Sequence, residues 1–220
     1  MGDVITIDGP AGSGKSTVAR ILAGKIGYTY LDTGAMYRAI ALLVKERNIS
    51  LEDKRGLKDI CRSMNIRFLY DSDPPCVFLG DRDISDAIRT SEMDMLSSRV
   101  SAIKEVREAM KVLQRNMAND IDIVAEGRDM GTVVFPDARI KFFLTASFEI
   151  RAERRYSERR MKGDSISFEI IKKELMKRDL QDSSRDLAPL RPAMDAIIVD
   201  TTDMDLKEVV NKMLFYIENC

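Results

Sequence analysis

The fold of this chain is decided by residues 4–17, which read VITIDGPAGSGKST. The first four of these residues are all β-branched, as in a buried strand. Residues 9–16 match the pattern G-x-x-x-x-G-K-[ST] without a mismatch, and a helical pattern begins at Thr17. A glycine-rich turn that binds nothing is the alternative. The strand before the loop and the helix after it favour a loop that binds phosphate groups.

The residue types in this loop fit the binding of a nucleotide. Its three glycines let the backbone approach a ligand closely, and the loop N–H groups face a phosphate beside the positive end of the next helix. Lys15 supplies a mobile positive charge for the β- and γ-phosphates, and the Ser16 hydroxyl is placed to bind Mg²⁺. The expected nucleotide-binding residues are Gly9, Pro10, Ala11, Gly12, Ser13, Gly14, Lys15, Ser16 and Thr17.

The composition fits a globular protein in which neither charge dominates. The chain has 220 residues, 45% hydrophobic and 32% charged, which suffices for one sizeable core without a second full domain. Its 35 basic and 36 acidic residues create no overall field that would attract nucleic acid or a membrane surface. Because we find neither a leader pattern nor an apolar run of membrane-spanning length, we expect a cytoplasmic protein without a nucleic-acid or membrane partner.

Cysteine and histidine usage narrows the chemistry further. Cys61, Cys76 and Cys220 are widely separated and odd in number, which indicates free thiols in a reducing compartment and argues against a zinc site. The chain has no histidine, which excludes Ser-His and Cys-His catalysis, HExxH metalloprotease chemistry and a phosphohistidine intermediate. Phosphoryl transfer to a phosphate is compatible with this composition, because that acceptor is already largely an anion at neutral pH.

Strands and helices alternate along the chain, as expected for a parallel α/β core. Residues 63–90 differ, because two short strands and tight turns there predict a small antiparallel lobe inserted into that core. A single long helix is expected over residues 92–117. The other expected strands are residues 28–31, 120–125, 142–144 and 196–200, and the other expected helices are residues 35–45, 151–160, 172–180 and 206–217.

Two arginines stand at positions that a structural role does not readily explain. Arg38 lies near the start of a helix, where a cation is unfavourable for the helix dipole. Arg107 interrupts the apolar stripe of the long helix, which is costly unless the charge is paired or faces a cleft. The alternatives to binding an anion are simple exposure of Arg38 and extension of the Arg107 head group to the surface.

Charged residues also follow one of the expected strands. Arg128 and Asp129 lie between glycines directly after the strand that ends at residue 125, the position at which open α/β sheets bind their ligands. Further along, Arg178, Asp182 and Arg185 recur at a spacing that can place them on one helical face. The Ser-Ser pair between the last two weakens that interpretation.

The most charged segment is residues 151–160, with five arginines in ten residues. Arg151, Arg155 and Arg159 recur every fourth residue and therefore share one helical face. Such a ridge is either a solvated face with Glu–Arg pairs or a lid that covers phosphates. In a chain with a phosphate loop we favour the lid, because arginine binds planar oxyanions and stays charged.

Together these motifs resemble those of the bacterial cytidylate kinases, a family of P-loop nucleoside-monophosphate kinases. Many families share the phosphate loop alone, but the run GRDMGTVVFPD at residues 127–137 is nearly diagnostic. The matching segments occur in the family's order between residues 4 and 200. They are residues 7–16, 31–38, 88–90 and 126–138, with Arg178, Asp179, Asp182 and Arg185.

The resemblance implies an α/β fold of the P-loop NTPase type, with three layers around a five-stranded parallel sheet. It also implies an NMP-binding lobe with a small antiparallel insert, and a mobile helical lid. We expect one cytidylate-kinase-like domain over residues 1–220. Its core comprises residues 1–35, 118–147 and 169–220, its NMP-binding lobe about residues 36–117, and its lid about residues 148–168.

The resemblance further implies Mg·ATP as phosphoryl donor and CMP or dCMP as acceptor, in pyrimidine nucleotide metabolism. We expect a monomer in which Ser16 binds the metal. The expected catalytic residues are Lys15, Arg128, Arg151, Arg155 and Arg178. The expected acceptor-binding residues are Thr33, Tyr37, Arg38, Ser98, Arg107, Arg128, Asp129, Arg178, Asp182 and Arg185.

Two residues depart from the family's usual pattern. Glu126 stands where many members have aspartate, which keeps a carboxylate near the metal waters on a longer side chain. Thr33 replaces a common serine, which keeps the hydroxyl and adds a methyl group near the substrate.

Three other functions compete with this interpretation. A UMP/CMP kinase or a shikimate-type kinase is the nearest, although the long insert and the run at residues 127–137 argue against both. A GTPase-like switch lacks support, because the chain has no Asn-Lys-x-Asp base-reading motif. Nucleic-acid binding by the arginine ridge is disfavoured by the balanced charge and the few aromatic residues.

Overall fold

The computed structural model describes residues 2–219, so the Cys220 thiol lies outside the described residues. The chain divides into two compact units. The phosphate-loop unit contains the residues up to Leu31 and those from Ala118 onward, and the second unit is Asp32–Met117. Cys61 and Cys76 form no disulfide, as expected. Among residues 2–219, no helix combines the length and the apolar character needed to cross a membrane.

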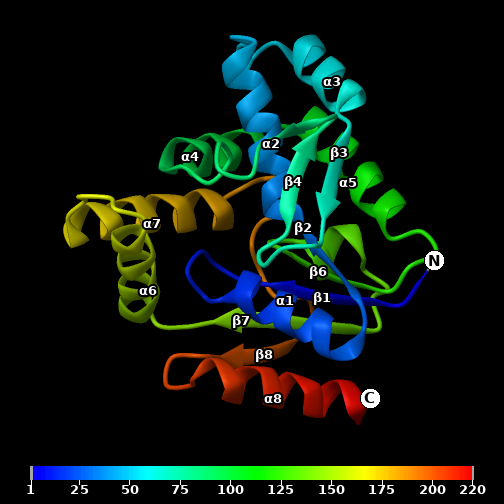
Figure 1. Ribbon diagram of the computed structural model, residues 1–220, viewed down its shortest axis with the longest axis vertical. Helices are drawn as coiled ribbons and strands as arrows, with labels where there is room; N and C mark the ends of the chain where they lie inside the picture. Colours follow the sequence, from blue (N-terminus) through cyan, green and yellow to red (C-terminus); the bar gives the residue numbers. More distant parts are fainter. Residues whose placement is uncertain (1, 220) are drawn as a thin grey trace. The chain divides into compact units, whose positions relative to one another are not determined.

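A five-stranded parallel sheet organises the phosphate-loop unit, which confirms the predicted fold class (Figure 1). The strand order is β2-β6-β1-β7-β8. β1 is central and buried along its whole length, which explains its uninterrupted run of β-branched residues. The strands are β1 Val4–Asp8, β2 Thr29–Asp32, β6 Ile123–Gly127, β7 Ile140–Thr145 and β8 Ile197–Asp200.

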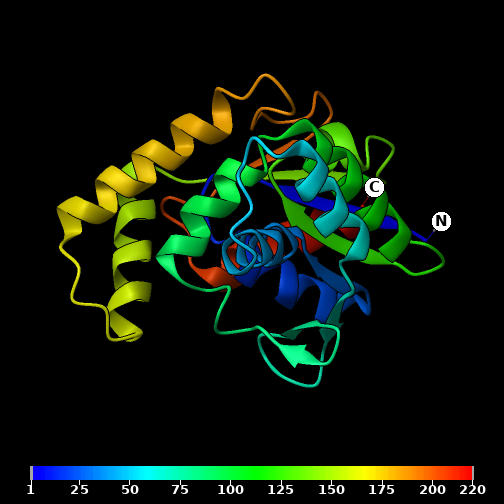
Figure 2. The ribbon, with the colours of Figure 1, turned by 90° about the horizontal axis from the view of Figure 1, so that it is seen from above.

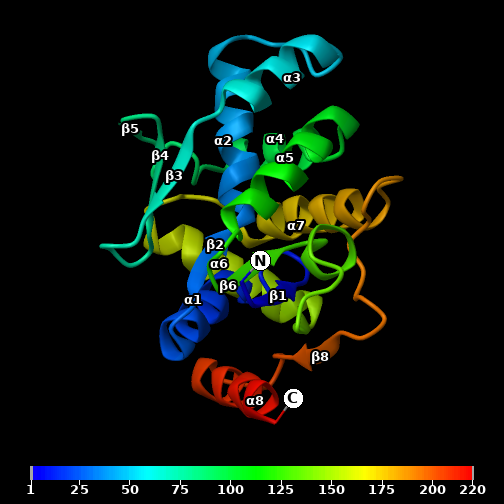
Figure 3. The ribbon, with the colours of Figure 1, turned by 90° about the vertical axis from the view of Figure 1, so that its right-hand side faces the viewer.

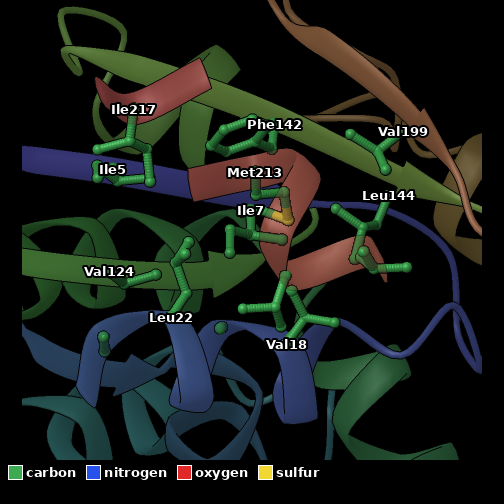
Figure 4. Close-up of a cluster of buried hydrophobic side chains, with 14 of the residues drawn as sticks. Ile5, Ile7, Val18, Leu22, Val124, Phe142, Leu144, Val199, Met213 and Ile217 are labelled. Atoms are coloured by element: carbon green, nitrogen blue, oxygen red, sulfur yellow. The ribbon is translucent and has the colours of Figure 1, made fainter. Parts of the chain in front are cut away.

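Helices α1 (Lys15–Ile26) and α8 (Leu206–Glu218) bury their apolar faces against this sheet. Figure 4 shows side chains from four of the strands meeting those of the two helices. The core is close-packed around the point where β1 leads into α1, so the loop between them rests on a rigid base. The labelled side chains are Ile5, Ile7, Val18, Leu22, Val124, Phe142, Leu144, Val199, Met213 and Ile217.

Helices α6 (Phe148–Met161) and α7 (Phe168–Ser183) lie side by side in the same unit (Figures 1 and 2). Each begins a few residues before the expected start, because the hydroxyl of Ser147 or Ser167 accepts a hydrogen bond from the helix backbone and caps it. A small apolar cluster joins these helices to the phosphate loop. Its members are Ala11, Ala152 and Leu175, with Phe148 and Phe168 packed against them.

The second unit contains four helices and a three-stranded sheet in its described part (Figure 3). The sheet is antiparallel, as predicted for residues 63–90, and it has a third strand where only turns and two strands were expected. The helices are α2 Thr33–Glu46, α3 Lys54–Ser63, α4 Ser91–Val100 and α5 Lys104–Met117, and the strands are β3 Ile66–Leu69, β4 Cys76–Leu79 and β5 Arg82–Asp83.

Helix α3 has no counterpart among the expected elements. Only Leu57, Ile60 and Cys61 of its ten residues are buried, so its apolar stripe is short. Asp53 caps it by accepting a hydrogen bond from the Gly56 N–H. The charged residues around this stripe conceal the helix in the sequence, and packing against α5 stabilises it.

The prediction of one helix over residues 92–117 is wrong, because the chain breaks at residues 101–103 between α4 and α5. The Ser101 hydroxyl donates to the Ser98 carbonyl at 2.9 Å, and the Arg107 guanidinium donates to the Ser101 carbonyl at 3.0 Å. These side-chain bonds compete with helix continuation. The buried face of α5 consists of Val106, Arg107, Met110 and Gln114.

Candidate active site

The phosphate loop joins β1 to α1 with the conformation its glycines predict. Gly9, Gly12 and Gly14 all have positive φ angles, of 151°, 77° and 87°. A Cβ atom on Gly9 would lie 2.0 Å from the Leu144 carbonyl oxygen, so no other residue fits there. The loop leads directly into the first turn of α1. The first N–H groups of a helix have no acceptor within it and can bind an anion.

Lys15 is buried and folded back over this loop. Its Nζ donates a hydrogen bond to the Pro10 carbonyl at 2.7 Å. Burial, together with the positive charge of Arg128 and despite the opposing carboxylate of Glu126, lowers the pKa of Lys15 to about 7. A nearby phosphate anion would favour the ammonium form, so this lysine is suited to a negatively charged ligand.

The oxygen atoms near the loop fit a magnesium ion that is held mainly by phosphates and water. The Ser16 side chain is exposed at the start of α1. Glu126 is the partner of Ile7 in the β1–β6 ladder, and its carboxylate accepts a hydrogen bond from the Tyr30 hydroxyl at 2.5 Å. Residues 2–219 contain no cluster of three ligating side chains, and a nucleotide-bound magnesium ion needs only one or two protein oxygens.

A buried carboxylate, that of Asp182, lies close to three arginines of the phosphate-loop unit. Arg128, just after β6, donates from Nε to Asp182 Oδ2 at 2.8 Å, and Arg185 donates to Asp182 Oδ1. Burial alone would raise the pKa of Asp182, but the guanidinium groups of Arg128, Arg185 and Arg178 lower it to about 2. We call these four residues the Asp182 cluster. It groups residues that the sequence analysis had assigned to acceptor binding.

Asp129 lies at the start of a π-helical turn, Met130–Val134, which was not anticipated. Its side chain is 2% exposed and does not cap that turn. The cap comes from Asp8 on β1, whose two carboxylate oxygens accept hydrogen bonds from the N–H groups of Met130 and Gly131. Asp8 was missed in the sequence analysis, although a carboxylate at the end of an otherwise apolar strand is a detectable signal.

The arginine ridge of α6 consists of side chains with separate partners. Arg151 is buried and donates to the carbonyls of Ala146 at 3.1 Å and Ala11 at 3.0 Å, and to Asp179 at 2.6 Å. Arg155 pairs with Glu158 at 2.7 Å, and Arg159 pairs with Asp164. In this conformation Arg151 therefore supports the phosphate loop from behind.

Arg154, which the sequence analysis did not single out, lies off this ridge. It donates to the hydroxyl and carbonyl oxygens of Thr201, which follows β8, at 2.9 and 2.7 Å. The two residues are far apart in the sequence, and no local pattern pairs them.

Two of the remaining candidates lie at the start of α2 in the second unit. Thr33 and Tyr37 are both buried, one helical turn apart. The Arg107 guanidinium lies 6.0 Å from the centre of the Tyr37 ring, so these side chains from α2 and α5 are adjacent. Ser98 is buried on α4. The second unit therefore brings Tyr37 and Arg107 together, although they are 70 positions apart.

Arg38 is held by two longer ion pairs in the same unit. Its guanidinium lies 3.4 Å from Asp32 and 3.8 Å from Asp94. Its Nε is buried and has no hydrogen-bond partner among residues 2–219. Asp32 is shared, because its other oxygen caps α2 by accepting from the Ala35 N–H at 2.7 Å. A cation with an unused donor is consistent with an anionic ligand.

Comparison with known proteins identifies relatives over almost the whole chain. A family model described as cytidylate kinase matches residues 5–219. The chain is 50% identical over 210 residues to a cytidylate kinase of Carboxydothermus hydrogenoformans, covering 96% of this chain and 95% of that protein. It is 43% identical over 216 residues to a cytidylate kinase of Vibrio cholerae, covering 98% and 96%.

Solved structures show the same fold at low sequence identity. A gluconokinase from Sinorhizobium meliloti has a TM-score of 0.50 at 16% identity, covering 99% of this chain and 92% of that one. An uncharacterized protein from Eubacterium ventriosum has a TM-score of 0.54 at 13% identity and covers both chains fully. These similarities concern the fold alone.

Proposed function

The chain belongs to the cytidylate kinase family, and from this premise we propose that it transfers the γ-phosphoryl group of ATP to CMP or dCMP. The products are ADP and CDP or dCDP. The observation that best supports this proposal is the combination of the phosphate loop with the Asp182 cluster in one compact unit. That unit therefore has a site for donor phosphates and fixed positive charges of the kind that phosphoryl transfer requires.

On the donor side, the loop amides and Lys15 bind the β- and γ-phosphates. Bound phosphate replaces the Pro10 carbonyl as the partner of the Lys15 ammonium. The Ser16 hydroxyl would hold the magnesium ion, with Glu126 acting through water, and the ion would neutralise charge on the phosphates. Because transfer passes through a loose transition state, the protein's contribution is position and charge.

On the acceptor side, Arg38 and Arg107 orient the CMP phosphate as the nucleophile. Uncharged side chains add further contacts to the acceptor, those of Thr33, Tyr37 and Ser98. The buried Nε of Arg38 and the position of the Arg107 guanidinium over the Tyr37 ring support these roles. An arginine fork is suited to a phosphate dianion, because it donates two parallel hydrogen bonds.

In the phosphate-loop unit, we also assign the Asp182 cluster and Asp129 to binding of the acceptor. Cytosine presents an amino donor beside the N3 and O2 acceptors, so a carboxylate and an arginine can read it together. We assign this reading to Asp129 with Arg185 or Asp182. Arg128 and Arg178 neutralise the charge that spreads over the transferred phosphoryl group.

Residues 148–168, which include α6 and the connection to α7, form the lid. Closure of the lid excludes water, which would otherwise accept the phosphoryl group. Arg155 faces the phosphates when the lid closes. Arg151 either faces them as well or keeps its hydrogen bond to the Ala11 carbonyl of the loop. The core comprises the residues up to 35, residues 118–147 and the residues from 169 onward. The NMP-binding lobe comprises residues 36–117. The cytoplasmic location and the monomeric state remain predictions.

The test is ADP formation from Mg·ATP with CMP, dCMP, UMP, AMP, GMP and shikimate supplied separately. Fast turnover with CMP and dCMP alone supports the proposal. The substitution Lys15→Met should then abolish this turnover. Equal turnover with UMP would contradict the cytosine-reading roles of Asp129 and Arg185. Turnover with shikimate alone would support the rival kinase, and no stimulation by any acceptor would refute the kinase function.

A further inference from the structure

Asp8 occupies an unusual position in the phosphate-loop unit. It is the last residue of the central strand β1 and is 4% exposed. One carboxylate oxygen accepts a hydrogen bond from the Met130 N–H at 2.9 Å, and the other accepts from the Gly131 N–H at 2.8 Å. Asp8 is not among the residues proposed to bind either nucleotide.

The two amides that Asp8 binds belong to the first turn of a helix. The first N–H groups of a helix have no acceptor within it and are normally capped by the preceding side chain. Here the preceding residue, Asp129, provides no cap. Asp8 therefore caps the Met130–Val134 turn from a neighbouring strand, which leaves the Asp129 side chain outside that role.

Asp8 fixes both ends of a two-residue segment, one through its backbone and the other through its side chain. On one side, Gly127 is paired with Asp8 in the β1–β6 ladder. On the other, the Asp8 carboxylate holds the amides of Met130 and Gly131. The only residues between these two attachments are Arg128 and Asp129. Arg128 extends from this segment to Asp182, and Asp129 is buried beside it.

The close approach of the turn to β1 supports this interpretation. A Cβ atom on Gly131 would lie 2.9 Å from the Thr6 hydroxyl oxygen and 3.2 Å from the Lys141 side chain. Glycine therefore lets the turn come within reach of a carboxylate as short as aspartate. Thr6 and Asp8 are two residues apart on β1 and face the same side of the sheet.

We propose that Asp8 is a positioning residue for the acceptor side of the reaction, acting through Arg128 and Asp129. The inference rests on the proposed function for its kinetic consequences and on geometry alone for its structural ones. A displacement of about 1 Å at a residue that stabilises the transition state can cost about 10²-fold in rate. Asp8 prevents that displacement although it contacts no substrate.

The test uses Asp8→Asn, with Thr6→Val as the matched control. Asparagine retains one acceptor oxygen but directs an NH₂ group at the second backbone N–H, so one hydrogen bond is lost and two donors face each other. Thr6 is fully buried and its hydroxyl has no partner among residues 2–219, so valine alters contact with the same glycine without removing a hydrogen bond.

For Asp8→Asn we expect kcat with CMP to fall about 10²-fold and the KM for CMP to rise about tenfold, while the KM for ATP changes less than about threefold. In an Arg128→Met background the same substitution should lower kcat by less than about tenfold, because its effect acts through Arg128. Thr6→Val should leave all three values unchanged. An equal rise in both KM values, or fully additive losses, would overturn the proposal in favour of a general structural role.

Amide hydrogen exchange provides a readout that does not depend on activity. The N–H groups of Met130 and Gly131 should exchange at least about tenfold faster in Asp8→Asn and at the wild-type rate in Thr6→Val. Unchanged exchange in Asp8→Asn would refute the cap. If the wild-type protein fails to phosphorylate CMP, the proposed function is wrong, and this exchange measurement alone decides whether Asp8 holds the segment.

Discussion

The arginines of the Asp182 cluster, in the phosphate-loop unit, and Arg38, in the second unit, are held in different ways. In the phosphate-loop unit, Arg128 and Arg185 are bonded to Asp182, which is 1% exposed. In the second unit, the ion pairs of Arg38 are longer, at 3.4 Å from Asp32 and 3.8 Å from Asp94, and both carboxylates are partly exposed. The first arrangement is a hydrogen-bonded buried network, and the second is a set of weak contacts around a cation.

This difference indicates that the two groups of charges contribute differently to stability. Removing one member of a buried ion network leaves another charge unpaired and is strongly destabilising. Removing an arginine from a loose, partly exposed pair costs little stability. We therefore expect substitutions in the Asp182 cluster to reduce both stability and catalysis. Substitutions at Arg38 should weaken acceptor binding and leave stability almost unchanged.

Arg128→Met should give the largest effect. We expect kcat to fall about 10³-fold, since a transition-state donor is lost, and the free energy of unfolding to fall by about 3 kcal/mol, since Asp182 loses a partner. Steady-state kinetics measures kcat, and chemical denaturation measures the free energy of unfolding. The control is Arg139→Met, which removes a surface pair with Asp3 and should change neither by much. A loss of kcat below tenfold would contradict the role of Arg128.

Arg38→Met should raise the KM for CMP about 10²-fold, while the free energy of unfolding changes by less than about 1 kcal/mol. Kinetics at varied CMP and thermal denaturation test this separation. Arg47→Met is the matched control, because Arg47 is an exposed cation at the other end of the same helix. If Arg38→Met destabilises the protein as much as Arg128→Met does, the comparison between the units fails.

The charge of Asp182 should make stability depend on pH. Its pKa is about 2 in the folded chain against 3.8 for the unfolded group. Its contribution, about 2 kcal/mol, is therefore fully present above the unfolded value and is lost as pH falls toward the folded value. The difference in unfolding free energy between wild type and Asp182→Asn should thus shrink as the pH falls from 5 to 3. A constant difference would show that the hydrogen bonds alone, and not the charge, stabilise this cluster.

The smallest expected effect is a gain in stability at Gln114 in the second unit. This side chain is fully buried, and neither atom of its amide group has a hydrogen-bond partner among residues 2–219. Gln114→Met keeps the volume and removes the buried polar atoms, so unfolding should cost about 1 kcal/mol more. Asn116→Ala, at an exposed site on the same helix, is the control. Destabilisation by Gln114→Met would indicate a ligand or water partner for the amide.

Local residue patterns were sufficient for much of the fold. The β-branched run at residues 4–7 predicted the central strand, and the glycines after it predicted the loop conformation because few other residues adopt those angles. The apolar periodicity at residues 92–117 led to a wrong prediction, that of a single helix. An apolar stripe continued across the break at Ser101, but the side-chain hydrogen bonds of Ser101 and Arg107 that compete with the helix there leave no trace in the apolar periodicity.

For the candidate site, too, some features follow from local sequence and others only from the tertiary structure. By itself, the sequence determined the parallel α/β fold, the phosphate loop and the identity of the charged residues, because each depends on neighbours within a few positions. Only the tertiary structure decided which charges are paired. The carboxylate of Asp182 meets Arg128 across 54 positions, and Asp8 reaches the amides of Met130 and Gly131 across more than 120. Such pairs form only when the fold brings distant segments together. At Asp182, the charges of the three arginines then outweigh the effect of burial and lower the pKa.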